Sequence, residues 1–157
     1  MTAIVVVGSL NMDFVVRVEH LPAPGQTVLG RDFQMIPGGK GANQACAAAK
    51  LGANSLTVRM VGRVGYDMFA DHLKASLSAA GVDVSAVHAT RAQATGVALI
   101  SVDASGQNSI VVASGANHAL AAQSVPSGTL GALDVNKAAP GTVAAADRDS
   151  ASMPRGD

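Results

Sequence analysis

A glycine-rich turn between a hydrophobic stretch and an alanine-rich one most constrains what this chain can fold into. Gly38, Gly39 and Gly41 leave three of four consecutive positions without a side chain, so the backbone can turn tightly and a ligand can come close. Lys40 adds a cation, and Asn43 adds an amide in the first turn of the predicted helix, where the N–H groups lack intrahelical partners. We interpret this strand–turn–helix as a site for a polar ligand. The alternative, a glycine-rich turn without a ligand, stays open at this point.

Two well-known glycine motifs do not match the turn. A P-loop needs a glycine five residues before its Gly-Lys pair and a Ser or Thr after it, but Gln34 and Gly41 hold those positions. The dinucleotide-binding fingerprint fails as well, because Gln44 stands where its third glycine belongs. Neither a P-loop cradle nor a Rossmann-type site is therefore expected.

Length and composition indicate one α/β domain with a substantial core. The 157 residues are 48% hydrophobic and 14% charged, with a formal net charge of +0. This balance gives no reason to expect nucleic acid or an anionic membrane surface as a partner. No apolar run reaches the roughly 18 residues of a membrane span, and residues 2–8 lack the basic start of a signal peptide. We therefore expect a cytoplasmic protein, with the single cysteine, Cys46, as a buried thiol.

A second group of polar residues follows the first predicted strand. Ile4–Val7 is a β-branched run typical of a strand buried in a parallel sheet, and Gly8 ends it. Ligands of open α/β sheets bind at the carboxyl ends of such strands. Asn11 and Asp13 alternate just beyond this end, so both can point into the same crevice. The alternative is that they only cap turns.

The remaining elements are predicted from periodicity and from turn residues. We expect one helix from about Gly41 to Leu51, and a second that starts at Asp67 as N-cap and ends at Gly81. An apolar stripe of Phe69, Leu73, Leu77 and Ala80 supports the second helix. Further strands are expected at 14–21, 27–36, 56–61 and 84–90, with a turn at 22–25, a turn from 62 to 67, and a hairpin of 95–103 with 108–113. His72 and His88 have no partners at metal-ligand spacing, so no metal site is expected.

The character of the sequence changes after about Leu120. Residues 121–157 contain no aromatic residue and no isoleucine, and prolines interrupt them at 126, 140 and 154. Such a segment buries too little apolar surface to offset its ordering entropy. We expect a domain over 1–120 and a mostly disordered or unrelated tail over 121–157.

Several motifs occur together in the order that they have in one enzyme family. They are Gly-Ser-Leu-Asn-Met-Asp at 8–13, Gly-Gly-Lys-Gly-Ala-Asn-Gln-Ala at 38–45, Gly-Arg-Val-Gly-Tyr-Asp at 62–67 and Thr-Gly-Val-Ala at 95–98. From Ile4 to about Leu120, the chain thus resembles the ribokinase-like carbohydrate kinases, also called the phosphofructokinase-B family. The full form of the run at 38–45 favours members that phosphorylate ribose over those that act on fructose or nucleosides.

The resemblance implies a doubly wound α/β sheet and a small β lid. The lid would comprise strands within 14–36 and the hairpin within 95–113, and two lids would pair in a homodimer. The sugar would lie between lid and sheet. The substrate-binding residues implied by the resemblance are Asn11, Asp13, Gly38, Gly39, Lys40 and Asn43. The implied reaction is ATP-dependent phosphorylation of D-ribose at its 5-hydroxyl, with magnesium and a monovalent cation.

The sequence departs from the family where the chemistry would be. The family's second signature, a Gly-Ala-Gly-Asp run that supplies the anion hole and the catalytic aspartate, does not occur in these 157 residues. A positioned general base contributes about 10²–10⁴-fold, and each oxyanion donor about 10²–10³-fold. We therefore assign no catalytic, nucleotide-binding or metal-binding residue, and expect no activity and poor binding of ATP and its cations. A truncated or frameshifted product would explain the pattern.

Three functional hypotheses remain open from the sequence. The chain derives from a ribose kinase, or it is a stand-alone module that binds sugar or dimerises through its lid, or it derives from a family kinase for another furanose or a nucleoside. We also expect poor folding of the isolated chain and self-association. The reason is that the few predicted strands of the sheet would leave a central strand exposed as an edge.

Overall fold

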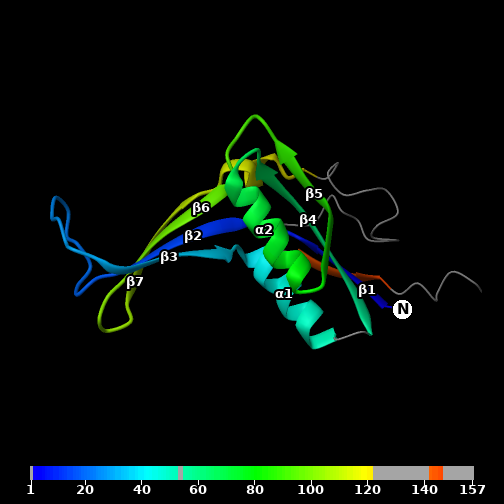
Figure 1. The fold of residues 1–157 in the computed structure, drawn as a ribbon, viewed down its shortest axis with the longest axis horizontal. Helices are drawn as coiled ribbons and strands as arrows, with labels where there is room; N and C mark the ends of the chain where they lie inside the picture. Colours follow the sequence, from blue (N-terminus) through cyan, green and yellow to red (C-terminus); the bar gives the residue numbers. More distant parts are fainter. Residues whose placement is uncertain (1, 53–54, 122–141, 147–157) are drawn as a thin grey trace, which may run out of the picture.

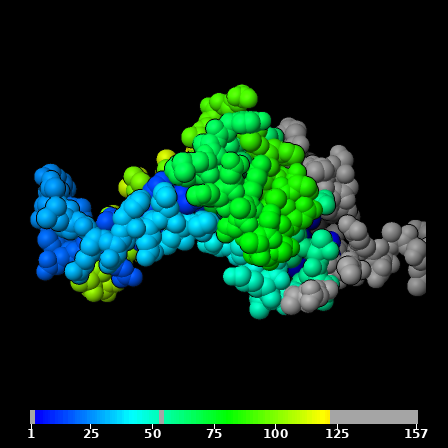
Figure 2. Space-filling model, viewed as in Figure 1, coloured from blue at the N-terminus to red at the C-terminus, as the bar shows by residue number. Residues whose placement is uncertain are grey.

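The computed structural model describes residues 2–52, 55–121 and 142–146. These residues form two four-stranded sheets, two α-helices and one short 3₁₀-helix (Figure 1). The main sheet has the strand order β5-β4-β1-β8 and carries both α-helices, whereas the second sheet, β3-β2-β6-β7, projects from it as an arm. We call the second sheet the lid sheet. In the space-filling view, the arm is narrow and the helical body is broad (Figure 2).

The main sheet is built on three parallel strands. β1 (Thr2–Val7) pairs with β4 (Leu56–Gly65), which pairs with β5 (Val82–Thr90). Side chains of these strands are buried on both sheet faces, since Val6 and Met60 join one apolar cluster while Val5 and Val61 join another. This two-sided burial is the reason that the strands are continuous apolar runs rather than alternating ones.

Both α-helices of the described residues cover the same face of the main sheet. α1 (Lys40–Gly52) lies on β1 and β4 and buries only small residues, such as Ala42 and Ala45, so that it can lie close to the sheet. α2 (Met68–Ala79) buries Leu73 and Leu77 against the same cluster. Each fully buried leucine contributes about 1.5–3 kcal/mol, so these two hold the helix in place. Ala80 is its C-cap, and Gly81 follows with φ +84°.

The lid sheet has two antiparallel pairs joined by a parallel pair. β2 (Asn11–Arg17) is antiparallel to β3 (Arg31–Gly38) and parallel to β6 (Gly96–Val102), and β6 forms a hairpin with β7 (Asn108–Ala113). Only residues 8–10 separate β1 from β2, so one nearly continuous segment serves both sheets. The hairpin expected at 95–113 and the lid expected from strands within 14–36 are therefore present.

One face of the lid sheet is tied to α2 by aromatic side chains. The ring of Phe14 on β2 meets that of Phe69 on α2 edge to face, with centroids 5.4 Å apart, and stacks on that of Phe33 at 6.0 Å. Such pairs contribute about 0.5–1.5 kcal/mol beyond area burial. Residues that alternate with Phe14, such as Asp13, face the other way. The packed face thereby fixes which face of the lid is open to a ligand.

Several predicted boundaries were wrong. The turn expected from Gly62 begins only after Gly65, because β4 continues in parallel register with β5 and buries Val64 completely. β2 begins at Asn11 rather than Phe14 and ends at Arg17. β3 begins at Arg31 rather than Thr27, and Asp32 has a φ of +55° inside the strand.

The tail was predicted to be mostly disordered, and one part of it is not. Thr142–Ala146 forms β8, which pairs antiparallel with β1. β1 is therefore flanked on both sides, and the exposed central edge that we expected is absent from the described residues. The prediction of disorder for the other residues beyond 121 concerns positions outside the described part of the chain.

Among the described residues, no helix has the length and apolar character needed to cross a membrane.

Candidate functional site

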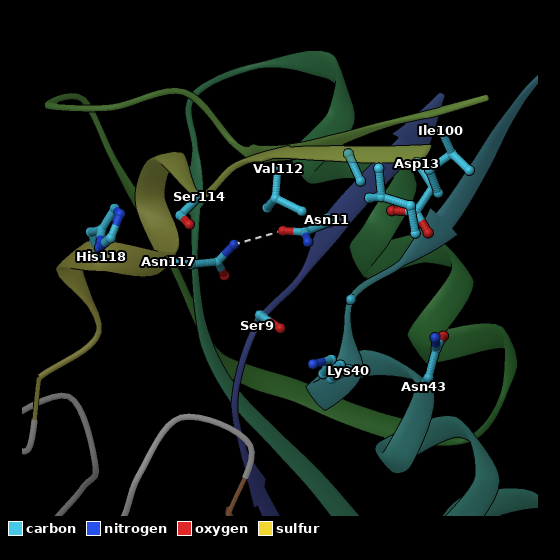
Figure 3. Close-up of a pocket in the computed structure, with 13 residues that line it drawn as sticks. Ser9, Asn11, Asp13, Lys40, Asn43, Ile100, Val112, Ser114, Asn117 and His118 are labelled. Atoms are coloured by element: carbon cyan, nitrogen blue, oxygen red, sulfur yellow. Dashed lines mark hydrogen bonds between the residues drawn. The ribbon is translucent and has the colours of Figure 1, made fainter. Parts of the chain in front are cut away.

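A pocket of about 450 Å³ lies where the two sheets meet, beyond the carboxyl end of β1 (Figure 3). Its floor comes from the β1–β2 segment and the start of α1. Its roof comes from β6 and β7, and its side from η1 (Gly115–Ala119), the 3₁₀-helix after β7. The lining residues are Ser9, Asn11, Asp13, Gly39, Lys40, Asn43, Ala98, Ile100, Ile110, Val112, Ser114, Asn117 and His118.

The glycine-rich turn is packed tightly against the β1–β2 segment. Gly39 has φ +98°, and a Cβ at this position would lie 2.6 Å from the carbonyl oxygen of Ser9. A Cβ on Gly41 would lie 2.8 Å from the Cα of Gly8. Both contacts are closer than real Cβ atoms tolerate, so only glycine allows this approach. The Ala42 N–H then donates to the Ser9 carbonyl at 3.1 Å, and the start of α1 becomes one wall of the pocket.

Asn11 and Asp13 both lie on the pocket face of β2. They are two residues apart on an extended strand, so their side chains point to the same side, as the sequence predicted. Gly38 does not line the pocket; it pairs with Asn11, and a Cβ there would collide with the Asp13 carboxylate. Its role is to leave room for Asp13. Burial raises the pKa of Asp13 above its usual value.

Lys40 and Asn43 approach the pocket from α1. Both are exposed residues of the first turn, and their side chains lie below the pocket in the close-up view (Figure 3). Of the six residues predicted to bind a ligand, five therefore line one pocket and Gly38 supports it. Whether these residues bind a sugar stays a prediction.

The roof of the pocket is apolar, which sequence reasoning missed. Ala98 and Ile100 on β6 lie opposite Val112 and Ile110 on β7, on the face that also carries Asp13. Ile110 and Val112 are 51% and 53% exposed, which is unusual for such side chains. The signal was available, because these four residues occupy alternating positions of a predicted hairpin. Most small-molecule pockets combine such an apolar surface with a few directed polar groups.

Asn117 is a second missed residue, and it holds the corner of the pocket. Its side-chain oxygen accepts from the Leu10 N–H at 2.9 Å, and its nitrogen donates to the Leu10 carbonyl at 3.0 Å and to the Asn11 side-chain oxygen at 2.8 Å. The sequence did not indicate this role, since no pattern shows that residues more than a hundred positions apart will meet.

The root of the lid is held by Asp67 and Thr95. Asp67 caps α2 as predicted, accepting from the Ala70 N–H at 3.1 Å, and also accepts from the Thr95 N–H at 2.8 Å and hydroxyl at 2.7 Å. Thr95 is 3% exposed, and its hydroxyl accepts from the Gly65 N–H at 2.9 Å. Burial acts to raise the pKa of Asp67, but the hydrogen bonds from Thr95, Ala70 and Phe69 outweigh it and lower the pKa. The start of β6 is thus tied to the main sheet.

The polar groups of the pocket are suited to hydrogen bonding rather than to holding a metal ion by themselves. Over residues 2–52, 55–121 and 142–146, no three His, Cys, Asp or Glu side chains come together in a way that could hold an ion. Among the described residues that line the pocket, Asp13 and His118 are the only ones of these types. We therefore assign no metal ligand among the described residues.

Comparison with known proteins identifies the family. The sequence profile described as pfkB family carbohydrate kinase matches residues 1–139. The chain belongs to this family. It is similar to the ribokinase of Bacillus subtilis, with 49% identity over 117 residues, which are 74% of this chain and 39% of that protein.

Solved structures of the family share the fold. The ribokinase of Thermotoga maritima superposes with a TM-score of 0.72 at 37% identity, over 80% of this chain and 41% of its own. The ribokinase of Arabidopsis thaliana, solved with ribose and ATP, gives 0.63 at 39% identity, over 72% and 36%. The chain thus spans about two-fifths of the length of these relatives.

These findings confirm the predicted family and its fold, that is, an α/β sheet with a β lid. The profile match reaches residue 139, past the boundary expected near Leu120. The division into 1–120 and 121–157 stays a prediction.

Proposed function

We propose that this chain carries the sugar-binding part of a kinase that transfers phosphate from ATP to the 5-hydroxyl of D-ribose. The observation that carries the proposal is the pocket itself. In a chain of the pfkB family, Asn11 and Asp13 meet the glycine turn at Gly39 beneath the lid. The names of the similar proteins, ribokinases in Bacillus subtilis, Thermotoga maritima and Arabidopsis thaliana, give the substrate class.

The chemistry of the pocket suits a small polyol. Asp13 offers carboxylate oxygens as acceptors, while Lys40 offers donors and Asn43 offers both. Sugar hydroxyls both donate and accept, so such a set can discriminate one hydroxyl pattern from another by leaving a wrong partner unpaired. The apolar roof of Ile100 and Ile110 suits the C–H groups of a sugar ring. Gly38 contributes by leaving room for the Asp13 carboxylate, and Gly39 contributes by letting the turn pack against the β1–β2 segment.

ATP would be the phosphate donor, and magnesium would neutralise its phosphates during transfer. A monovalent cation belongs to the same proposal. We assign none of these to residues of this chain, because the Gly-Ala-Gly-Asp run does not occur in it. The proposal is therefore that these 157 residues recognise the sugar and do not catalyse transfer alone.

The test combines a binding panel with an activity assay. Isothermal titration should give saturable binding of D-ribose that is tighter than binding of D-fructose or adenosine, and a coupled ADP-release assay with ATP and magnesium should give no turnover. Tighter binding of fructose or adenosine would assign the chain to another kinase of the family. Turnover that Asp13→Ala abolishes would contradict the assignment of a binding part only.

We also propose that two copies associate through their lids. On the face of the lid opposite the pocket, Phe33, Leu99 and Val111 are 62%, 55% and 64% exposed. An exposed apolar sheet face of this kind is typical of an interaction site. Two copies that pair through this face would be related by a twofold axis, so that each copy offers the other the same apolar surface. Light scattering after size exclusion should give a dimer that Leu99→Lys with Val111→Lys converts to a monomer. A monomeric parent chain would contradict this proposal.

A further inference from the structure

Asn117 makes three hydrogen bonds that together leave only one orientation for two side-chain amides. The Leu10 N–H can only donate and the Leu10 carbonyl can only accept. Asn117 meets both, at 2.9 and 3.0 Å, so its oxygen must face the Leu10 nitrogen and its NH₂ must face the Leu10 oxygen. The backbone of residue 10 therefore fixes which way the Asn117 amide points.

This orientation is passed on to Asn11. The second hydrogen of the Asn117 NH₂ points to Asn11 at 2.8 Å, so Asn11 must offer its oxygen there. A flipped Asn11 would place one NH₂ against another. In the close-up view, the Asn11 oxygen faces Asn117 along the dashed line and its nitrogen points away from Asn117 (Figure 3).

Gly96 leaves the space in which the two amides meet. A Cβ at Gly96 would collide with the Asn11 side-chain oxygen and with the Asn117 side-chain nitrogen. η1 itself is held there by a bond from the Ala116 N–H to the Ala94 carbonyl at 2.8 Å. The contact therefore depends on β6 and η1 as well as on β2.

We propose that Asn117 is a positioning residue that fixes Asn11 as a hydrogen-bond donor toward the pocket. The proposal rests on the proposed function, and deepens it, because it assigns a polarity to one subsite. The ligand atom that meets Asn11 must accept, as a ring oxygen or a hydroxyl lone pair does, whereas the atom that meets the Asp13 carboxylate must donate. Asn117 touches no ligand in this role; it acts through Asn11.

Amide exchange tests the orientation without any ligand. Side-chain amide signals can be assigned with single Asn variants. The two NH₂ hydrogens of Asn117 should exchange at least about tenfold more slowly than those of the exposed Asn43, because both Asn117 hydrogens are donated in hydrogen bonds. The Asn11 NH₂ should exchange quickly. In Asn117→Asp, the carboxylate only accepts, so Asn11 should flip and its NH₂ should become the slow one. Fast exchange at Asn117 in the parent chain would overturn the proposal.

A double-mutant cycle tests the consequence for binding. Asn117→Asp should weaken D-ribose binding on the order of 10-fold or more, because it turns a donor toward the ligand into an acceptor. Asn117→Ala should weaken it less, since Asn11 can then adopt either orientation. In an Asn11→Ala background, both changes should alter affinity by less than about twofold. Asn108→Asp, the same substitution on an exposed residue of the lid, is the matched control and should bind as the parent does.

The two proposals fail in different ways. If the parent chain does not bind ribose, the proposed function fails, and the exchange rates still decide the orientation of Asn117 and Asn11. If ribose binds, but Asn117→Asp weakens it equally with and without the Asn11 side chain, Asn117 acts only on the fold and the positioning role is wrong. Thermal unfolding of each variant identifies any that do not fold.

Discussion

At the scale of single residues, the site depends on glycines, whose lack of a side chain allows close backbone contacts. Gly39 lies in the left-handed region of φ, and its backbone touches the β1–β2 segment, whereas Gly81 has a similar φ with nothing within 4 Å of a Cβ. Substitutions at the two glycines therefore distinguish two costs. Both positions have a left-handed backbone conformation, but only Gly39 also has backbone atoms in close contact. The turn can hold the start of α1 against Ser9 only while position 39 has no side chain.

We expect Gly39→Ala to destabilise the chain more than Gly81→Ala. Gly81→Ala should cost about 1–2 kcal/mol for the left-handed conformation alone. Gly39→Ala should cost about 1–3 kcal/mol more, because its Cβ overpacks the backbone. Urea unfolding of the two variants measures the difference, and equal costs would mean that the close approach at Gly39 is not maintained in solution.

Asp67 provides a prediction on pH dependence. Its pKa is lowered in the folded chain, so its contribution to stability is present above the unfolded pKa of about 3.9 and is lost as pH falls through the folded value. Asp67→Asn keeps the shape but loses the charge and replaces one acceptor oxygen with an NH₂ group that can only donate, so it should cost about 1–2 kcal/mol at pH 7. This cost should shrink progressively below about pH 4. Asp71→Asn removes an exposed charge from the same helical turn and should cost less at pH 7. A cost of Asp67→Asn that is the same at pH 3 and pH 7 would contradict the account.

Sequence reasoning worked for residues whose role is local. The Asp67 cap and the alternation of Asn11 with Asp13 follow from a few neighbouring positions, and the structure has both. Asn117 and Thr95 were missed because their partners, Leu10 and Asp67, are distant in the chain. A residue whose partners come from another element leaves no periodic signal.

At the scale of elements, the lid is a separate sheet with a defined root. Thr95 immediately precedes β6. Its hydroxyl donates to the Asp67 carboxylate and accepts from the Gly65 N–H. Phe14 and Phe69 provide the second attachment, through α2. Loss of the Thr95 hydroxyl should therefore loosen the lid before it unfolds the main sheet.

We expect Thr95→Val, which keeps the size of the side chain, to cost about 1–3 kcal/mol because it leaves the buried Gly65 N–H without a partner. Amide exchange should accelerate in β6 and β7 more than in β1 and β4. Thr95→Ser keeps the hydroxyl and should retain most of the protection. Equal acceleration in both sheets would show that Thr95 supports the whole fold and not the lid in particular.

The predicted elements were correct in type where the pattern was long, as for α2 and the hairpin of β6 and β7. Boundaries failed where tertiary pairing decided them. Gly62 and Gly65 look like turn residues, yet parallel pairing with β5 keeps them in β4. Leu29 looks like a strand residue, yet it is 92% exposed and lies outside β3.

At the scale of the whole molecule, one extended segment joins the two sheets and places the pocket at their junction. β1 and β2 are nearly continuous, so the carboxyl end of a main-sheet strand is also the start of a lid strand. The family fold could be predicted, because its motifs follow each other in order. β8 could not, since Thr142–Ala146 is a short run of small residues, and its pairing with β1 links residues more than 130 positions apart.

The most direct test of the central claim is a titration of the chain with D-ribose, followed by backbone and side-chain NMR. We expect saturable shifts confined to the pocket, at Ser9, Asn11, Gly39 and Asn43 and at the lid residues that face them. Asp13→Asn should weaken the affinity on the order of 10-fold or more, since it removes a charged acceptor. Asp32→Asn, an exposed change on the lid, should leave it unaltered. An absence of shifts, or shifts that Asp13→Asn does not weaken, would contradict the claim that this pocket recognises the sugar.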